Sequence, residues 1–340
     1  MKIFLSILVV AALLLAGGIY LDKNQGSSGL TLESLLDKKE EKKTELQDYG
    51  PAPDFAGISA WLNSEPLALA DLKGKVVLVD FWTYSCINCV RTFPHISGWY
   101  EKYKDQGLVV VGVHTPEFPF EKDTANVQTA LKRFNIAYPV AQDNDYATWG
   151  AYKNQYWPAH YLINKEGRIV YTHFGEGEYD VTENMIRLAL GLEKADMPAD
   201  EESAGRIGSP EMYFGRARLE NLTTKQNPVT IAHDYTWPKD IAFNSFALDG
   251  RWEFGEEFAR LLSDTGKIKL RFSSGKIFMV ADNPDQEATL KISVDGRPGS
   301  EIKVKGSQLY TLFDSAEYRE HIIEIEIQGA GFRAFTFTFG

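Results

Sequence analysis

The chain has 340 residues, 44% of them hydrophobic and 24% charged, which is a globular composition with room for about two ordinary domains. Its formal net charge of -11 argues against nucleic-acid binding, because phosphate recognition requires a basic surface. The chain contains only two cysteines, Cys86 and Cys89, so a framework of several structural disulfides is excluded.

The N-terminal segment resembles an export signal. Residues 3–20 are apolar except for Ser6 and follow Lys2, which places a positive charge ahead of the apolar run. About eighteen residues is the lower limit for crossing a bilayer. There is no lipobox cysteine, and Ala16-Gly17-Gly18 is a weak cleavage site. We therefore expect residues 1–21 to be an uncleaved membrane anchor, with a cleaved signal peptide as the alternative, and the remaining chain to be extracytoplasmic.

Residues 22–49 are predicted to be a charged, flexible linker. The charges from Asp37 to Lys43 alternate in pairs, so attractive and repulsive contacts compete and an isolated helix would be marginal. Pro51 and Pro53 then hold the chain extended.

The next segment carries both cysteines. Val76 to Val79 is aliphatic throughout, which is typical of a strand buried on both faces. We expect this strand to end near Trp82 and a helix to start at about Cys86. Unpaired backbone N–H groups and the helix dipole would then stabilise a thiolate at Cys86, which makes Cys86 the predicted nucleophile. Cys89 lies one turn further along the same face and is the predicted resolving thiol.

Other uses of the cysteine pair are less favoured. A structural zinc site needs about four ligands, and only six scattered histidines are present to supplement the two thiols. A c-type haem would require histidine directly after the second cysteine, where Val90 stands. A structural disulfide closing so small a loop would stabilise little. We expect a redox-active disulfide between Cys86 and Cys89, with no metal and no other cofactor.

The stretch from Asp80 to Cys89 resembles the active site of thioredoxin-fold proteins. Asp80 falls where thioredoxins have a buried carboxylate, Trp82 on their active-site tryptophan, and Pro94 on the proline that kinks the helix. Three further stretches resemble the extracytoplasmic TlpA-like branch, and specifically the soluble part of DipZ-type proteins: residues 112–117, 141–149 and 155–163. The resemblance covers about residues 50–340.

This resemblance also implies partners. DipZ-type proteins usually carry a multi-span CcdA-type membrane domain ahead of this part, whereas a single apolar segment precedes it here. The resemblance therefore implies a CcdA- or DsbD-type membrane electron donor on a separate chain, supplying electrons for oxidised proteins or apocytochrome thiols.

After the cysteine helix, expected to reach about Lys104, the pattern alternates strands and helices. Strands are predicted at residues 108–113, 138–141, 159–164 and 168–174, and helices at 124–133, 146–152 and 181–190. This order predicts an α/β thioredoxin-like domain over residues 50–196, with the cysteines at the carboxyl end of a strand. The resemblance adds an N-terminal hairpin before Lys73.

Residues 197–209 are rich in acidic residues and glycine and are predicted to be a second linker. Beyond them, apolar and polar residues alternate at 266–272, 288–294, 322–327 and 332–339, which predicts an all-β sandwich of about eight strands over residues 210–340. The resemblance implies a sandwich like a carbohydrate-binding module. Tyr235, Trp237 and Trp252 would either stack on a sugar ring or, as we favour, fill the core.

The residues around the cysteines suggest the direction of electron flow. Ile87 and Asn88 add neither charge nor imidazole, so the Cys86 thiolate should be only moderately stabilised and the pair should be reducing. Asp80, if buried below the pair, would accept the proton of Cys89 during the second step; the alternative is an Asp80 that caps the following turn.

The resemblance assigns further residues to the site. It makes Pro158 the cis-proline that faces the cysteines and, with Trp82 and Trp157, part of the substrate-binding surface. By sequence alone, a trans proline entering a strand fits Pro158 equally well. Glu117 matches a glutamate near the active site of some TlpA-like proteins, with an exposed loop acid as the alternative.

These observations predict an extracytoplasmic thiol-disulfide oxidoreductase that acts as a protein-disulfide reductase. A thiol peroxidase is one alternative, because Thr83 stands three residues before Cys86 as in peroxiredoxins, although Val79 occupies the place of the accompanying proline. The other alternative is a glycan-binding protein in which the β-sandwich is the working domain.

Overall fold

The computed structural model describes residues 46–198, 208–223 and 232–340. The predicted anchor (residues 1–21), most of the charged linker (22–49) and most of the linker at 197–209 lie outside the described residues. Within the described part of the chain, no helix is both long and apolar enough to cross a membrane.

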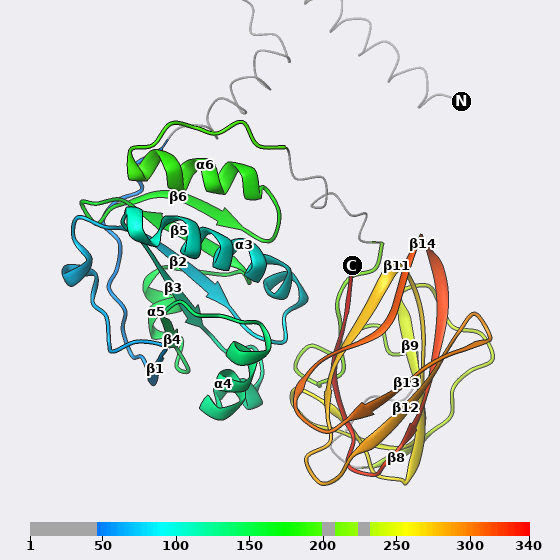
Figure 1. Cartoon of the computed structure of the whole chain (residues 1–340). Helices are drawn as coiled ribbons and strands as arrows, with labels where there is room; N and C mark the ends of the chain where they lie inside the picture. Colours follow the sequence, from blue (N-terminus) through cyan, green and yellow to red (C-terminus); the bar gives the residue numbers. More distant parts are fainter. Residues whose placement is uncertain (1–45, 199–207, 224–231) are drawn as a thin grey trace, which may run out of the picture. The chain divides into compact units, whose positions relative to one another are not determined.

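Strand β2 (Val76–Trp82) lies inside a six-stranded sheet with the order β1-β4-β3-β2-β5-β6 (Figure 1). Its neighbours β3 (Leu108–His114) and β5 (Ala159–Ile163) pair with it in parallel and antiparallel directions respectively. The outer strands are β4 (Val140–Gln142), β1 (Ala60–Leu62) and β6 (Ile169–Phe174). All residues of β2 are buried, as its aliphatic sequence predicted.

Helices cover both faces of this sheet. On one face, α3 (Ile87–Tyr103) and α6 (Tyr179–Leu190) contribute to the same apolar core, together with α4 (Thr124–Arg133). The short helix α5 (Ala147–Ala151) lies next to a second core on the opposite face, which the segment at residues 52–72 also covers. Short 3-10 turns are η1 (Leu69–Leu72), η2 (Lys104–Gln106) and η3 (Pro119–Lys122). The predicted α/β thioredoxin-like fold is confirmed.

The segment before β2 differs from the expected hairpin. Within residues 50–72 the structure forms one strand, β1, which pairs with β4 rather than with a second strand of its own. The expected strand at residues 138–141 likewise begins later, at Val140. Pro139 precedes it and has no N–H group to donate to a neighbouring strand.

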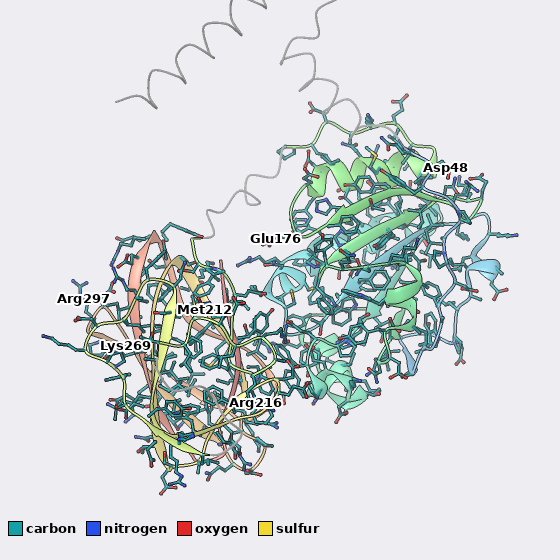
Figure 2. All side chains as sticks on the ribbon, turned by 180° about the vertical axis from the view of Figure 1, so that it is seen from behind. Asp48, Glu176, Met212, Arg216, Lys269 and Arg297 are labelled. Atoms are coloured by element: carbon teal, nitrogen blue, oxygen red, sulfur yellow. The ribbon has the colours of Figure 1, made fainter. Side chains whose placement is uncertain are left out.

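The C-terminal part is mostly β, as expected. Its strands form one nine-stranded hydrogen-bonded sheet around a single apolar core, rather than two separate sheets. The strands are β7 (Met212–Tyr213), β8 (His233–Tyr235), β9 (Ser245–Phe254), β10 (Ala259–Leu261), β11 (Thr265–Asp282), β12 (Ala288–Val294), β13 (Arg297–Val304), β14 (Gln308–Gln328) and β15 (Arg333–Phe339). Met212 lies among the packed side chains and Arg297 on the outside (Figure 2).

The two longest strands, β11 and β14, each pair with more than one other strand of this sheet. The first part of β11 pairs with β9 and its last part with β15, while β14 pairs with β11 along nearly its whole length. The register shifts between Ser274 and Lys276, where a β-bulge lets both strands bend. The sequence pattern predicted only the first part of β11, because Ser273, Ser274 and Gly275 interrupt the apolar alternation.

We predict that Gly112→Ala destabilises the protein. A Cβ atom at Gly112 in β3 would lie 2.7 Å from Trp82 Nε1 and 3.0 Å from a ring carbon of Tyr138, both of which are fully buried. Such overpacking costs about 1–3 kcal/mol in the free energy of unfolding. Urea denaturation of the full chain would measure it. The control is Gly150→Ala in α5, where no atom lies within 4 Å of the added carbon and we expect no loss; equal effects of the two substitutions would contradict the prediction.

Candidate active site

The two cysteines occupy the first turn of α3. Cys86 is the N-cap residue, with an extended backbone (φ -79°, ψ 117°), and Cys89 lies in the first turn of the helix. Both are free thiols, but Cys86 is partly exposed whereas Cys89 is fully buried. A protein disulfide can therefore approach Cys86 and not Cys89, which is the difference that the two predicted roles require.

Burial also controls the protonation of Cys89. Loss of solvation raises the pKa of the Cys89 thiol, and the neighbouring Cys86 sulfur and the Asp80 carboxylate raise it further. A thiol in this position holds its proton and would need a base before it could attack a disulfide. Asp80 lies in β2 and is fully buried, and its charge reaches Cys89. It is not an exposed cap of the following turn.

The loop before β5 lies opposite Cys86. The peptide bond between Trp157 and Pro158 is cis, as the resemblance implied. The carbonyl oxygen of Trp157 is 4.0 Å from the Cys86 sulfur, and the indole of Trp157 donates to the Thr115 carbonyl at 3.1 Å. Trp157 is half-buried and so remains accessible beside the Cys86 sulfur.

Trp82 does not share this position. Its side chain is fully buried and packs edge-on against Phe93 and His114, with ring centroids 5.1 and 4.8 Å apart. His114 is itself buried, which lowers its pKa to about 3 and keeps the imidazole neutral. Trp82 therefore supports the start of α3 from below, and in this structure it presents no surface to a substrate.

The side chain of Glu117 is bound by residues of the C-terminal domain. Arg218 Nη1 donates to Glu117 Oε1 at 2.6 Å, and the Tyr213 hydroxyl donates to the same oxygen at 3.0 Å. Arg218 also pairs with Glu257 at 3.0 Å. The carboxylate of Glu117 is thus held by a cation from the other domain. None of these hydrogen bonds involves a cysteine.

Glu121 is the acid that supports the cysteine loop, and sequence reasoning missed it. It is fully buried, and its Oε1 accepts from the Ser85 hydroxyl at 2.6 Å. Its Oε2 accepts from the backbone N–H groups of Glu117 and Phe118 at 2.6 and 2.9 Å. Burial raises the pKa of Glu121 to about 7 despite these bonds. The available signal was an acid at the third position of the short turn that begins with Pro119.

The C-terminal domain also contacts the dipeptide between the cysteines. Ile87 is only 7% exposed and belongs to an apolar cluster formed with residues of both domains: Phe118, Phe278, Val280, Leu309 and Phe335. Phe118 and Phe335 meet with ring centroids 5.3 Å apart. The β domain therefore covers one side of the Cys86 loop.

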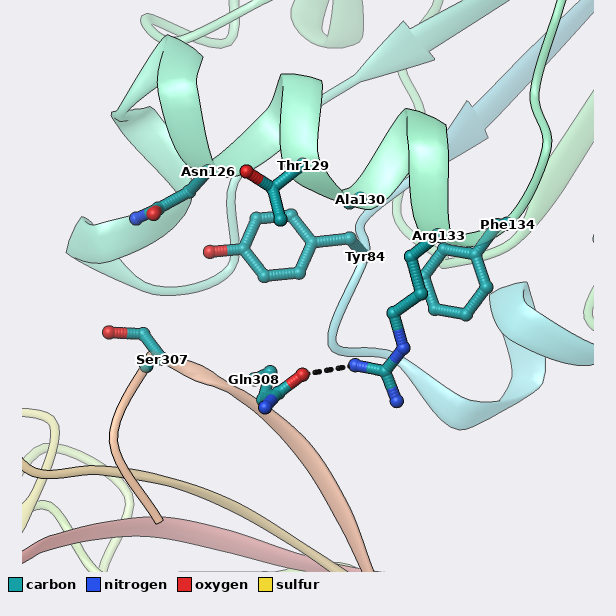
Figure 3. Close-up of a pocket in the computed structure, with 9 residues that line it drawn as sticks. Tyr84, Asn126, Thr129, Ala130, Arg133, Phe134, Ser307 and Gln308 are labelled. Atoms are coloured by element: carbon teal, nitrogen blue, oxygen red, sulfur yellow. Dashed lines mark hydrogen bonds between the residues drawn. The ribbon is translucent and has the colours of Figure 1, made fainter. Parts of the chain in front are cut away.

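A pocket of about 140 Å³ lies between α4 and the turn at Gly306–Gln308, with Tyr84 in its wall (Figure 3). Arg133 donates to the side-chain oxygen of Gln308 across it. Neither cysteine lines it.

The aromatic residues considered for sugar stacking are placed differently. Trp252 is fully buried and Tyr235 is 4% exposed, so both are core residues, as favoured from the sequence. Trp237 is half-buried, with the amino group of Lys269 4.5 Å from its ring centroid.

Comparison with known proteins identifies the family. A family model described as "Thioredoxin like C-terminal domain" matches residues 209–340, and one described as "AhpC/TSA family" matches residues 50–172. Two Bacillus subtilis proteins, thiol-disulfide oxidoreductases YkuV and ResA, are each 31% identical to this chain. The matches cover 41% of this chain and 94% of YkuV, and 45% of this chain and 79% of ResA. The chain belongs to the TlpA- and DipZ-type family of thiol-disulfide oxidoreductases.

Protein DipZ of Mycobacterium tuberculosis is 37% identical over 308 residues, which is 87% of this chain. That match covers 44% of DipZ, so the chain spans less than half the length of this relative. Unlike the Bacillus matches, it extends through most of the chain, so this TlpA- and DipZ-type oxidoreductase resembles DipZ beyond the redox domain.

We predict that Glu121 makes the reactivity of Cys86 depend on pH near 7. Because the pKa of Glu121 is raised to about 7, the carboxyl is largely protonated below that pH and charged above it. The Glu121 carboxylate accepts from Ser85, the residue next to Cys86, so its negative charge lies close to the Cys86 loop. Rates of iodoacetamide labelling in a Cys89→Ser background should show a step near pH 7, and Glu121→Gln should abolish it and react faster above that pH.

The control for this prediction is Glu211→Gln, which changes an acid of the C-terminal domain whose pKa is also raised to about 7 but which bonds to Tyr213 rather than Ser85. It should leave the step in place. Superimposable labelling profiles for Glu121→Gln and its parent would contradict a role for this acid.

Proposed function

We propose that this protein is an extracytoplasmic protein-disulfide reductase in which Cys86 attacks and Cys89 resolves. The observation that carries the proposal is the unequal burial of the two thiols, one partly exposed at the N-cap of α3 and one enclosed a turn later. Helix N-termini favour thiolates, and exchange requires one accessible thiolate with a second thiol in reach. The names of the relatives YkuV and ResA support the same chemistry.

The reaction proceeds in two exchanges. The Cys86 thiolate attacks one sulfur of a client disulfide, the client S–S bond breaks, and one client thiolate leaves as the Cys86–client bond forms. Asp80 then takes the proton of Cys89, and the resulting thiolate attacks the Cys86 sulfur. The Cys86–client bond breaks, the Cys86–Cys89 disulfide forms, and the second client thiolate leaves. Two electrons pass to the client.

The backbone beside Pro158 would hold the client during this sequence. The Trp157 carbonyl faces the Cys86 sulfur, and Trp157 is accessible beside it. An extended client segment placed there would pair with backbone groups of this loop as an added strand does. Trp157 and Pro158 are therefore the proposed substrate-binding residues, and Glu117 has no direct part.

The oxidised pair must be reduced again for the next cycle. We assign this to a CcdA- or DsbD-type membrane dithiol on another chain, with this protein held near the membrane by residues 3–20. The proposed clients are oxidised proteins or apocytochrome thiols at the outer face of the membrane, and the reaction uses the Cys86–Cys89 disulfide without a further cofactor. A carbohydrate-binding role of the β domain is a separate proposal that none of its core aromatic residues supports.

We predict that Cys89→Ser accumulates a mixed disulfide between Cys86 and its client, because the resolving thiol is absent. Asp80→Asn, in contrast, should form that intermediate at the wild-type rate and resolve it more slowly, by roughly 10²–10⁴-fold, the usual contribution of a general base. Mass spectrometry of quenched reactions measures both. Asp71→Asn on the turn η1 serves as a control with wild-type rates. Failure of Cys89→Ser to trap any protein would reject the proposed function.

We also predict a reducing midpoint for the pair, near that of thioredoxin at about -270 mV, because Ile87 and Asn88 add no charge that stabilises the thiolate. Equilibration with glutathione buffers followed by thiol labelling measures it. A midpoint near about -120 mV, as in strongly oxidising pairs, would reverse the assigned direction. Rapid oxidation of Cys86 by peroxide in Cys89→Ser would instead favour the peroxidase alternative.

A further inference from the structure

A row of ionisable side chains crosses the sheet beneath α3. Strand register pairs Asp80 of β2 with His160 of β5, and His160 with His173 of β6. Directly paired residues project from the same face of a sheet. Residues at alternate positions of β2, Leu78 and Trp82, belong to the core that contains Cys89, so the row lies on the face covered by α3.

The row leads from the interior toward solvent. Asp80 and His160 are both fully buried, and His160 Nε2 is 3.2 Å from Asp80 Oδ1. The His160 and His173 rings stack with centroids 5.8 Å apart and planes 15° apart, and His173 is 9% exposed. His173 Nδ1 is 3.4 Å from Glu178 Oε2, and the Glu178 side chain is 38% exposed. Exposure therefore rises along the row from Asp80 to Glu178.

The contact between Asp80 and His160 is not the kind that stabilises a fold. It lacks the alignment of a hydrogen bond, and no other hydrogen bond to these side chains occurs within the described residues. A buried pair of ionisable groups usually adds little to folding stability compared with apolar residues of similar size. The next residues on the same face, Leu78 and Leu162, are apolar and fit the same core. Clusters of buried ionisable groups are found preferentially at functional sites.

The proposed reaction moves a proton at this position. Each turnover moves a proton from Cys89 to Asp80, and each reduction of the disulfide returns one to the Cys89 sulfur. Asp80 and Cys89 are both fully buried, so neither exchanges protons directly with solvent. The proton that Asp80 accepts either returns to Cys89 when the disulfide is reduced or leaves through a neighbouring group, and His160 is the titratable residue in contact with Asp80.

We propose that His160 and His173 form a proton relay that connects Asp80 to Glu178 at the surface. This proposal rests on the function proposed above. The proton that Asp80 accepts from Cys89 passes to His160, then to His173, and is released at Glu178. The imidazole rings face each other, so transfer between them requires a ring rotation or a bridging water. The histidines do not touch the client and are positioning residues for Asp80.

The test separates the two exchanges with 5,5'-dithiobis(2-nitrobenzoate) as the disulfide. Attack by Cys86 releases one thionitrobenzoate anion, and resolution by Cys89 releases the second, so stopped-flow absorbance resolves both steps in the full chain. His160→Gln should leave the first release unchanged and slow the second at least about tenfold, less than loss of the base itself. When both proteins are measured in D₂O, the second step of His160→Gln should also be slower than that of the wild type.

Two further substitutions, at less buried residues, keep the proposal testable if His160→Gln does not fold. His173→Gln, nearer the surface, should slow the second release less than His160→Gln does, and Glu178→Gln, with its exposed side chain, should slow it least. The matched control is His321→Gln in the C-terminal domain, which breaks another His–Asp contact, 2.9 Å from Asp295, at a residue 3% exposed. It should change neither release.

The outcomes are distinct. A graded loss confined to the second step supports the relay. Wild-type second-step rates in all three row variants overturn it while leaving the proposed reductase intact, and so does an equal slowing of both steps, which would indicate a structural role. If Cys89→Ser never forms the mixed disulfide with the reagent, the proposed function fails, and the relay fails with it.

Discussion

The unequal burial of two thiols in the first turn of α3 is the constraint on which the site depends. Cys86 is the N-cap residue and reaches solvent, whereas Cys89 points into the core below the helix. A thiol at the helix terminus gains from unpaired N–H groups, while a buried thiol resists ionisation. The first turn of this helix therefore holds one accessible sulfur and one buried sulfur that resists ionisation.

Burial of Asp80, the proposed base, costs free energy of desolvation, and its ionisable neighbours lie on the same face of the sheet. Asp80 occupies the middle of a strand whose other residues are all apolar and buried, so its carboxylate has no access to water. His160 and His173 lie beside it in neighbouring strands because of register, not because of any local sequence pattern. The buried face near Cys89 thus carries polar groups from three neighbouring strands.

The other side of the cysteine loop is held by a different set of contacts. Glu121 binds Ser85 and the turn after β3, and Glu117 in that turn is paired with Arg218 of the β domain. Ile87, between the cysteines, packs against Phe278 of the same domain. The β domain therefore limits the directions from which a disulfide reaches Cys86, and it does so with core-like packing rather than with a separate binding pocket.

The sequence alone predicted the redox pair and determined the buried strand before it, the α/β order and the β-rich C-terminal part, because these depend on local periodicity and on adjacent residues. Only the tertiary structure decided which acid serves the loop and what surrounds Asp80. Glu117 and Glu121 are equally acidic in sequence, and their roles diverge because one faces Arg218 and the other is enclosed beneath Ser85. His160 and Asp80 are distant in sequence and meet only because strand register and burial set their contact.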